Sequence, residues 1–396
     1  MIPTIGRPSL SMLLDALATQ QAGTTQQAGT TQQAGTARQA GTTQQAGTAR
    51  QAGTARQAGT ARQAGTARRE PADLAEPVLA DLEILLVDDR AGHGAALAVP
   101  AALTPYAKVL TGTGGGPAAA RNVGWRAARQ PWVAFLDDDV LPDPDWLRRL
   151  VADLDVPGDV GGVQGRIVVP LPTGRRPTDW ERVTSGLADS RWVTADMAYR
   201  RAALTAVDGF DERFPRAFRE DSDIAYRVRR AGWRLVRGDR TVRHPVRPEG
   251  PWISLRTQRG NADDALLRRS YGPRWREVLD VPAGRRRRHV AMTTAGAVAV
   301  AGGLALAVGT VSANRRALAG VTALAAAGWA AGTAEFAWAR IAPGPRTRAE
   351  VTTMLVTTVL IPPLAVGHWC AGWWRSRDTA RADLPRGRIG AGEDHA

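Results

Sequence analysis

The sequence predicts an α/β domain followed by long apolar helices. Two observations carry this prediction. Short β-prone apolar runs alternate with helical stretches up to residue 280, which is typical of a sheet covered by helices. After residue 285, three runs of Ala, Gly, Val and Leu are each long enough to cross the hydrocarbon core of a membrane, which takes ~20 residues.

The most informative stretch is residues 132–146, WVAFLDDDVLPDPDW. A buried strand at Trp132–Leu136 passes directly into the acidic triplet Asp137–Asp139, and Asp143 is placed to cap a helix that begins at Pro144. Carboxylates crowded at the carboxyl end of a strand repel one another, and this end is where α/β sheets bind ligands. The triplet therefore indicates either a divalent cation shared with a phosphorylated ligand or a solvated acidic turn.

Composition limits the partners. The formal net charge is +14, and Lys108 is the only lysine, so nearly all cations are arginines. Such a balance fits phosphate-rich partners or an anionic membrane face. The single cysteine, Cys370, excludes an internal disulfide framework, and no secretory signal opens the chain, so the amino-terminal part is expected in the cytosol.

Residues 21–68 are tandem copies of a six-residue Gln-Ala-Gly-Thr unit. The unit has no large apolar residue and cannot offset the entropy of ordering, so we expect a disordered insert between the first helix and the second strand. The strand before it is short, since only Met1 and Ile2 precede Pro3. Either the chain start is assigned too late or this strand is brief.

The other expected elements flank these segments. Strands are expected at residues 82–87, 107–110 and 160–169, and helices at 9–17, 118–128 and 224–231. The glycine cluster at 112–116 fits neither a dinucleotide-binding nor a P-loop fingerprint, because the spacing differs and no Lys-Ser/Thr pair follows.

Taken in order, the motifs IPTIGRP, LLVDD, AAARNVGW, WVAFLDDD, ADMAYRR, GFDERF and REDSDIAYRVRRAGW resemble the family 2 glycosyltransferases of the GT-A (Rossmann-like) fold. The resemblance covers Ile2 to about Tyr271 apart from the insert. It implies a nucleotide-diphosphate-sugar donor, a divalent cation (Mn²⁺ or Mg²⁺) and inversion at the anomeric carbon.

The resemblance also implies roles for individual residues. Asp137 and Asp139 match the outer positions of the DXD metal motif, and Asp221, with Glu220 before it, matches the general base. The residues implied for donor binding are Pro3, Thr4, Arg7, Asp88, Arg121, Asp138 and Gln164. His244 is similar to a histidine that joins the metal in some relatives.

Two of these assignments have structural alternatives. Asp221 could instead be a helix N-terminal acid stabilised by the helix dipole. His244 could be a loop histidine packed beside the site. The motif Gln-x-x-Arg-Trp of processive synthases is not found near residues 256–260, which favours single transfers.

The region 285–377 is expected to be transmembrane, with two to three spans at about 290–311, 317–341 and 351–374, followed by a disordered tail at 378–396. The basic run Arg285–Arg288 would keep its end in the cytosol, and Trp369, Trp373 and Trp374 resemble an interfacial belt. The alternative is a buried helical domain. Orientation of the last run stays open because Arg375 and Arg377 follow it.

These observations predict a membrane-anchored, metal-dependent, hexosyltransferase-like inverting glycosyltransferase. Its domain 1–280 would act at the cytosolic face of the plasma membrane on a hydroxyl acceptor of a cell-envelope glycan or glycolipid. No nucleic-acid partner is expected. The alternative is a non-catalytic membrane scaffold with a degenerate sugar-nucleotide domain.

Overall fold

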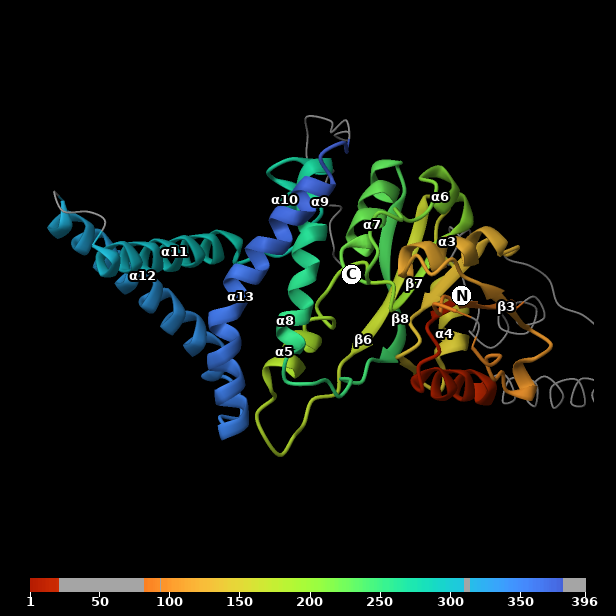
Figure 1. Ribbon diagram of the computed structural model, residues 1–396. Helices are drawn as coiled ribbons and strands as arrows, with labels where there is room; N and C mark the ends of the chain where they lie inside the picture. The colour runs from red at the N-terminus through yellow and green to blue at the C-terminus, as the bar shows by residue number, and fades with distance from the viewer. Residues whose placement is uncertain (21–81, 93, 310–313, 380–396) are drawn as a thin grey trace, which may run out of the picture.

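The computed structural model describes residues 1–20, 82–92, 94–309 and 314–379. The predicted insert at 21–68 and nearly all of the predicted tail therefore lie outside the described residues. The described part is an α/β domain with three long helices beside it, which confirms the predicted fold class (Figure 1).

Strands and helices follow one another in the predicted order. They are β1 (Ile2–Thr4), a helix over residues 9–20, β2 (Ile84–Asp88), η1 (Ala101–Leu103), β3 (Ala107–Thr111), α3 (Pro117–Ala127), β4 (Trp132–Leu136), β5 (Leu141–Pro142), α4 (Trp146–Asp153), β6 (Val160–Val168), α5 (Asp179–Ser185), β7 (Asp196–Arg200), α6 (Arg201–Ala206), α7 (Glu220–Arg230), β8 (Arg234–Arg243), α8 (Ile253–Arg256), η2 (Thr257–Gly260), α9 (Asn261–Tyr271), α10 (Trp275–Val278), α11 (Arg286–Val308), α12 (Arg315–Ile341) and α13 (Arg348–Arg375).

The strands form a three-stranded sheet, β3-β2-β1, and a five-stranded sheet, β4-β7-β6-β8-β5, and the two meet where the start of β1 lies beside β4. Strands β1, β2 and β3 are parallel. Main-chain bonds join β4 to β1: the Met1 amino group donates to the Ala134 carbonyl (2.7 Å), and the Leu136 amide donates to the Met1 carbonyl (3.1 Å). The chain order therefore switches direction between β1 and β4, which is where open α/β sheets bind ligands.

Helices cover both faces of the central strands, and this explains why β2 and β7 are buried along nearly their whole length. Successive residues of β4 point to opposite faces of the sheet. Leu136 packs with Leu14 of the helix over residues 9–20 and with Trp146 of α4. Phe135 packs on the other face, with α3, α6 and α7.

Two helices begin elsewhere than the sequence predicts. α4 begins at Trp146, after Asp145, because β5 and the Asp143 amide, which donates to the Thr241 carbonyl (3.0 Å), hold the preceding residues against β8. α7 begins at Glu220, four residues before the predicted start, after Arg219 adopts a left-handed conformation (φ 79°). The earlier start places both predicted catalytic acids in the first turn of the helix.

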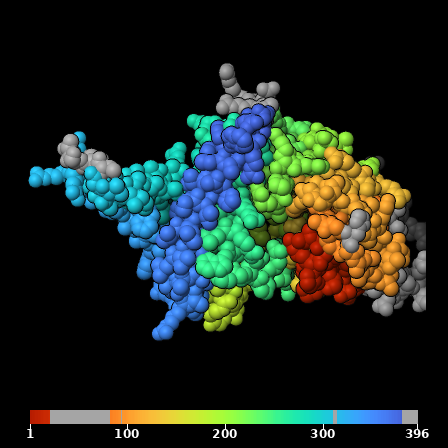
Figure 2. Space-filling model, in the orientation of Figure 1, coloured from red at the N-terminus to blue at the C-terminus, as the bar shows by residue number. Residues whose placement is uncertain are grey.

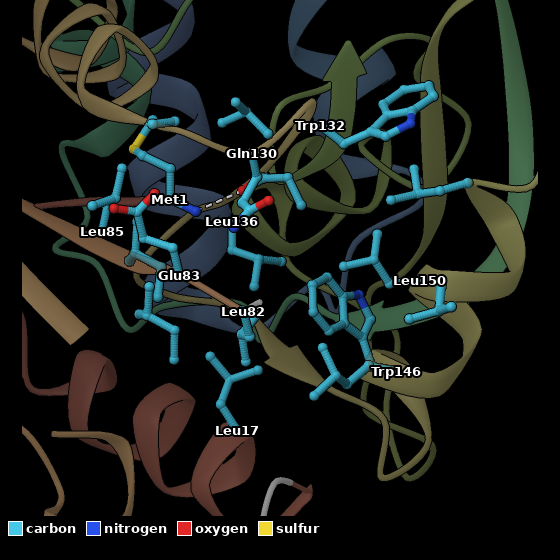
Figure 3. A pocket seen from close by; sticks show the side chains of 18 of the residues that line it. Met1, Leu17, Leu82, Glu83, Leu85, Gln130, Trp132, Leu136, Trp146 and Leu150 are labelled. Atoms are coloured by element: carbon cyan, nitrogen blue, oxygen red, sulfur yellow. Dashed lines mark hydrogen bonds between the residues drawn. The ribbon is translucent and has the colours of Figure 1, made fainter. Parts of the chain in front are cut away.

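An apolar cavity of about 380 Å³ lies at the start of β1 and β4, at the opposite end of these strands from the acidic triplet. Side chains including Leu17, Leu82 and Trp146 line it (Figure 3). Burial lowers the pKa of the adjacent Met1 amino group to about 5. Glu83 is the only carboxylate among the lining residues, so this cavity lacks the convergent polar groups of a catalytic site.

The helices α11, α12 and α13 are each long and apolar enough to cross a membrane. They extend the predicted runs by a few residues at the amino ends, where arginines begin each helix. α11 and α12 form a hairpin that projects from the α/β domain, whereas α13 runs along that domain (Figures 1 and 2).

Candidate active site

A cleft of about 550 Å³ opens at the carboxyl ends of β1 and β4, at the switch point of the sheet. Its floor is the acidic triplet that follows β4, and its walls come from α3, α5, α7, η2 and the loop after β8. The polar and charged side chains that line it belong to Thr4, Arg7, Asp89, Arg121, Asp137, Asp138, Asp139, Thr184, Arg216, Glu220, Asp221, His244, Arg247, Arg256, Thr257 and Arg259. The cleft is large enough for a ligand of drug size.

The three carboxylates of the triplet have different partners. Asp137 accepts from Arg121 Nη2 (2.9 Å). Asp138 accepts from the Thr4 hydroxyl (2.7 Å) and from Arg7, and so ties the ends of β1 and β4 together. Asp139 lies 3.2 Å from Arg247 Nε. Arginines thus offset the mutual repulsion of the three carboxylates. The sequence predicts a bound cation in this role.

Asp139 ionises less readily than an ordinary aspartate despite these neighbours. Burial, and then the charge of Asp137, raise its pKa, while His244, Arg247 and Arg7 oppose the shift. A buried carboxylate in this condition favours an additional positive charge. A nearby cation would therefore favour the ionised form of Asp139.

Arg121 joins the triplet to the second acidic group. Its guanidinium is buried (2% exposed) and donates to both Asp137 and Glu220 Oε1 (2.8 Å), and it lies 3.8 Å from Asp221 Oδ1. Burial alone would lower the pKa of Arg121, but the three carboxylates raise it instead. The Arg121 guanidinium thus links the acidic triplet after β4 to the acidic pair at the start of α7.

The pair Glu220 and Asp221 retains a proton more strongly than free carboxylates do. Burial and the charge of Asp221 raise the pKa of Glu220 to about 8, against the pull of Arg121. Burial also raises the pKa of Asp221, which accepts a hydrogen bond from the Thr194 hydroxyl (2.5 Å). Glu220 Oε2 is buried with no hydrogen-bond partner among the described residues. Carboxyl groups with raised pKa values in a cleft are common at functional sites.

The predicted metal ligands fit a divalent cation only as a partial donor set. Among the described residues, no group of three or more His, Cys, Asp or Glu side chains is arranged to hold a metal ion by itself. However, His244 Nε2 lies 3.6 Å from Asp139 Oδ1, and the buried His244 Nδ1 has no hydrogen-bond partner in the described part of the chain. Mg²⁺ and Mn²⁺ often take only one or two protein carboxylates and complete their shell with water and substrate phosphates. Asp137, Asp139 and His244 fit such a partial donor set.

Most predicted site residues meet in the cleft. The residues that line it are Pro3, Thr4, Arg7, Arg121, Asp137, Asp138, Asp139, Glu220, Asp221 and His244. Segments more than 200 residues apart in the sequence therefore contribute to one site.

Two predicted donor-binding residues are not brought into the cleft. Asp88 turns away from it and accepts from Arg90 through both carboxylate oxygens (2.8 and 2.6 Å). Gln164 is buried in β6, where its amide accepts from the Trp192 amide and donates to the Ser190 carbonyl (3.2 Å). Both side chains have local partners in this structure, and their roles in donor binding stay predictions.

Three residues that the sequence analysis missed contribute to the site. Asp89, next to Asp88, lines the cleft and accepts from the amides of Gly114 and Gly116 (2.7 and 2.9 Å). Arg247 reaches Asp139 from the loop after β8, and Thr194 orients Asp221. The doubled aspartate was a signal for Asp89, whereas no sequence signal marked Arg247 or Thr194.

The fold and the cleft define an α/β domain with an open cleft at the switch point of its strand order, where open α/β sheets bind ligands. Residues 75–223 match the family model described as Glycosyl transferase family 2. The chain is 37% identical over 134 residues to the pre-mycofactocin glycosyltransferase of Mycobacterium tuberculosis (strain CDC 1551 / Oshkosh), a match that covers 30% of this chain and 28% of that relative. It is 35% identical over 91 residues to the succinoglycan biosynthesis protein ExoO of Rhizobium meliloti (strain 1021), covering 23% of this chain and 26% of that protein.

A mannosyltransferase structure from Pyrobaculum calidifontis, in complex with GDP-Man and Mn²⁺, aligns with a TM-score of 0.39 and 17% identity, over 75% of this chain and 79% of that one. The family assignment rests on the sequence matches. The match at residues 75–223 supports the resemblance to glycosyl transferase family 2 that the motifs predict. It spans little more than a quarter of the length of the relatives it matches, so their substrates remain properties of those proteins.

Proposed function

We propose that the α/β domain transfers a sugar from a nucleoside-diphosphate-sugar donor to a hydroxyl acceptor, with inversion at the anomeric carbon. The observation that carries this proposal is the meeting of two acidic groups, Asp137–Asp139 and Glu220–Asp221, in one cleft of a family 2 domain. Direct displacement needs a base on one face of the sugar and charge compensation for the departing diphosphate on the other. The cleft supplies groups for both.

Asp221 is the proposed base. Its side chain is 21% exposed and lines the cleft, so an acceptor hydroxyl can reach it. The Thr194 hydroxyl donates to Oδ1 and holds the carboxylate in one orientation. Its raised pKa makes it a stronger base than an ordinary aspartate. Glu220 faces Arg121 instead and positions that guanidinium.

Asp137 and Asp139, with His244, would hold a divalent cation together with the donor diphosphate. When bound, the cation supplies positive charge for the leaving group. The chain's own residues add to this charge: Arg7 and Arg247 lie beside the triplet and reach into the same cleft. Thr4 and Asp138, which hydrogen-bond to each other at the end of β1, are positioned to meet the nucleoside.

The proposed site of action is the cytosolic face of the plasma membrane, on a glycan or lipid-linked acceptor. The supporting observations are the three helices long and apolar enough to span a membrane and the basic runs beside them.

A donor screen tests the proposal. Full-length protein in membranes would be supplied with a panel of labelled UDP- and GDP-sugars, Mn²⁺ and a membrane extract as acceptor source. We expect one donor to be consumed, with release of its nucleoside diphosphate and inverted configuration in the product. Tight donor binding without any consumption would favour the scaffold alternative, and the absence of both binding and consumption across the panel would overturn the proposal.

A further inference from the structure

Both ends of α13 contact the α/β domain. In its first turn, the Glu350 carboxylate accepts a hydrogen bond from the amide of Asp179, the first residue of α5 (2.8 Å). Near its last turn, Gly372 packs so closely on α9 that a Cβ there would lie 2.5 Å from the backbone of Ala262. A helix that crosses a bilayer has its ends on opposite faces of the membrane, so these contacts do not fit a third span.

α13 instead lies across the base of the α11–α12 hairpin. The guanidinium of Arg286, the first residue of α11, lies 4.7 Å from the centre of the Trp369 ring. Arg340, close to the end of α12, donates to the Thr357 hydroxyl (2.7 Å). Thr357 and Trp369 are separated by about 18 Å along α13 at ~1.5 Å per residue. Figures 1 and 2 show the same arrangement, with α11 and α12 projecting away from the helix that runs along the domain.

The two sides of α13 differ in what covers them. One side is buried against the protein, through residues spaced three or four apart: Met354, Thr357, Thr358, Ile361 and Ala365. The other side exposes large apolar residues that recur at a spacing of four: Leu355, Val356, Val359, Leu360 and Leu364, each at least 39% exposed. Such a helix has one protein face and one continuous apolar face.

We propose that α13 lies in the plane of the bilayer surface with its exposed apolar face in lipid, and that only α11 and α12 cross the membrane. On its buried side Ile361 packs with Met292 of α11 and Phe336 of α12, so α13 borders the proposed spans, and Trp374 (67% exposed) sits at its end as interfacial tryptophans do. α8 and η2 separate α13 from the cleft, so the cleft lies one layer of helices from the lipid.

The distribution of arginines agrees with two spans. In this arrangement most arginines beside the helices lie on the side of the membrane that carries the α/β domain: Arg285–Arg288, Arg346, Arg348, Arg375 and Arg377. Arg315 and Arg316 lie on the other side of the membrane. Three spans would move Arg375 and Arg377 to the opposite face and weaken this asymmetry. The excess of arginine on one face is the pattern that orients membrane proteins.

Cysteine accessibility tests the topology. Full-length variants with one cysteine each (Asn314→Cys, Ala349→Cys or Asp378→Cys, all with Cys370→Ala) would be exposed to a membrane-impermeant maleimide in inside-out and right-side-out vesicles. All three positions are exposed in the structure. We expect Ala349→Cys and Asp378→Cys to react in the same type of vesicle and Asn314→Cys in the other. Reaction of Asp378→Cys together with Asn314→Cys would overturn the proposal.

Depth measurement provides an independent readout. A fluorophore on Leu360→Cys in the middle of α13 would be compared with one on Leu324→Cys in α12, which is 76% exposed, again with Cys370→Ala. In vesicles that carry lipid quenchers near the headgroup or deep in the acyl chains, we expect shallow quenching for α13 and deep quenching for α12. Deep quenching at Leu360→Cys would show a span, and no quenching at either depth would show that protein covers this face; either result refutes the proposal.

Discussion

The role of Asp221 leads to a prediction that separates catalysis from folding. Asp221→Asn keeps the size of the side chain and an oxygen that can accept from the Thr194 hydroxyl, so the first turn of α7 should stay in place. The amide can no longer take a proton from the acceptor. Loss of a general base commonly reduces rates by a factor of about 10² to 10⁴, which is about 2.7 to 5.5 kcal/mol of transition-state stabilisation. We therefore expect turnover of at most a few hundredths of the wild-type rate.

Stability should move in the opposite direction. The pKa of Asp221 is raised in the folded protein, chiefly by burial, so ionisation of this carboxylate is harder in the folded than in the unfolded chain. The folded state consequently loses stability as the pH rises through that pKa. An uncharged amide removes this loss, and Asp221→Asn should unfold at the same temperature as wild type or a higher one at pH 8.

Asp223→Asn is the matched control, two residues along the same helix. Asp223 does not line the cleft, and its carboxylate accepts from the Tyr271 hydroxyl (2.5 Å) and pairs with Arg227 (2.7 Å). We expect this variant to keep its turnover per folded molecule within a few-fold of wild type, because its contacts lie outside the cleft. Donor consumption and thermal unfolding of both variants check this. Near-normal turnover of Asp221→Asn beside an inactive, folded Asp223→Asn would refute the assignment of the base.

Three further predictions follow from the same contacts. Transfer should increase as the pH rises through the raised pKa of Asp221, because the proposed base must lose its proton, and Glu220→Gln should move this rise to lower pH; a flat profile in wild type would contradict it. Arg240→Met should lower the free energy of unfolding by about 3–5 kcal/mol in urea titrations, because fully buried Arg240 pairs with Asp196 (2.7 Å) and Asp153 (3.0 Å). The control Arg166→Met, which breaks an exposed ion pair, should cost less than about 1 kcal/mol. The full-length protein should stay in the membrane pellet after a carbonate wash, and its release would count against the α11–α12 hairpin as a pair of spans.

Much of the fold was predictable because it depends on local patterns. The strand at Trp132–Leu136 was predicted to the residue, since an apolar run followed by three aspartates leaves little choice of boundary. The start of α7 was missed because Arg219 takes a left-handed conformation without being glycine, and nothing in its sequence context marks that. The sequence predicts Asp88 in the donor site, whereas the side chain that lines the cleft is that of its neighbour Asp89. Successive residues at a strand end point in opposite directions, so a shift of one position changes which of the two enters the cleft.

Contacts between segments that are distant in the chain could not be predicted from the sequence. Arg247 reaches Asp139 only because β8 and β4 end on the same side of the sheet, and single-sequence patterns carry no such pairing. The last apolar run had the length and composition of a span, since hydropathy does not distinguish a helix that crosses a bilayer from one with a single lipid face. Its contacts at Glu350 and Gly372 make that distinction.

Metal-linked nucleotide binding tests the central claim most directly. Calorimetric titration of the purified full-length protein with UDP and with GDP, in Mn²⁺ or in a chelator, compares wild type with Asp139→Asn. We predict that wild type binds one of the two nucleotides at least about tenfold more tightly with Mn²⁺, a difference of about 1.4 kcal/mol, and that Asp139→Asn loses this difference. Equal affinity of wild type with and without the metal would contradict a cation held between the acidic triplet and the donor diphosphate.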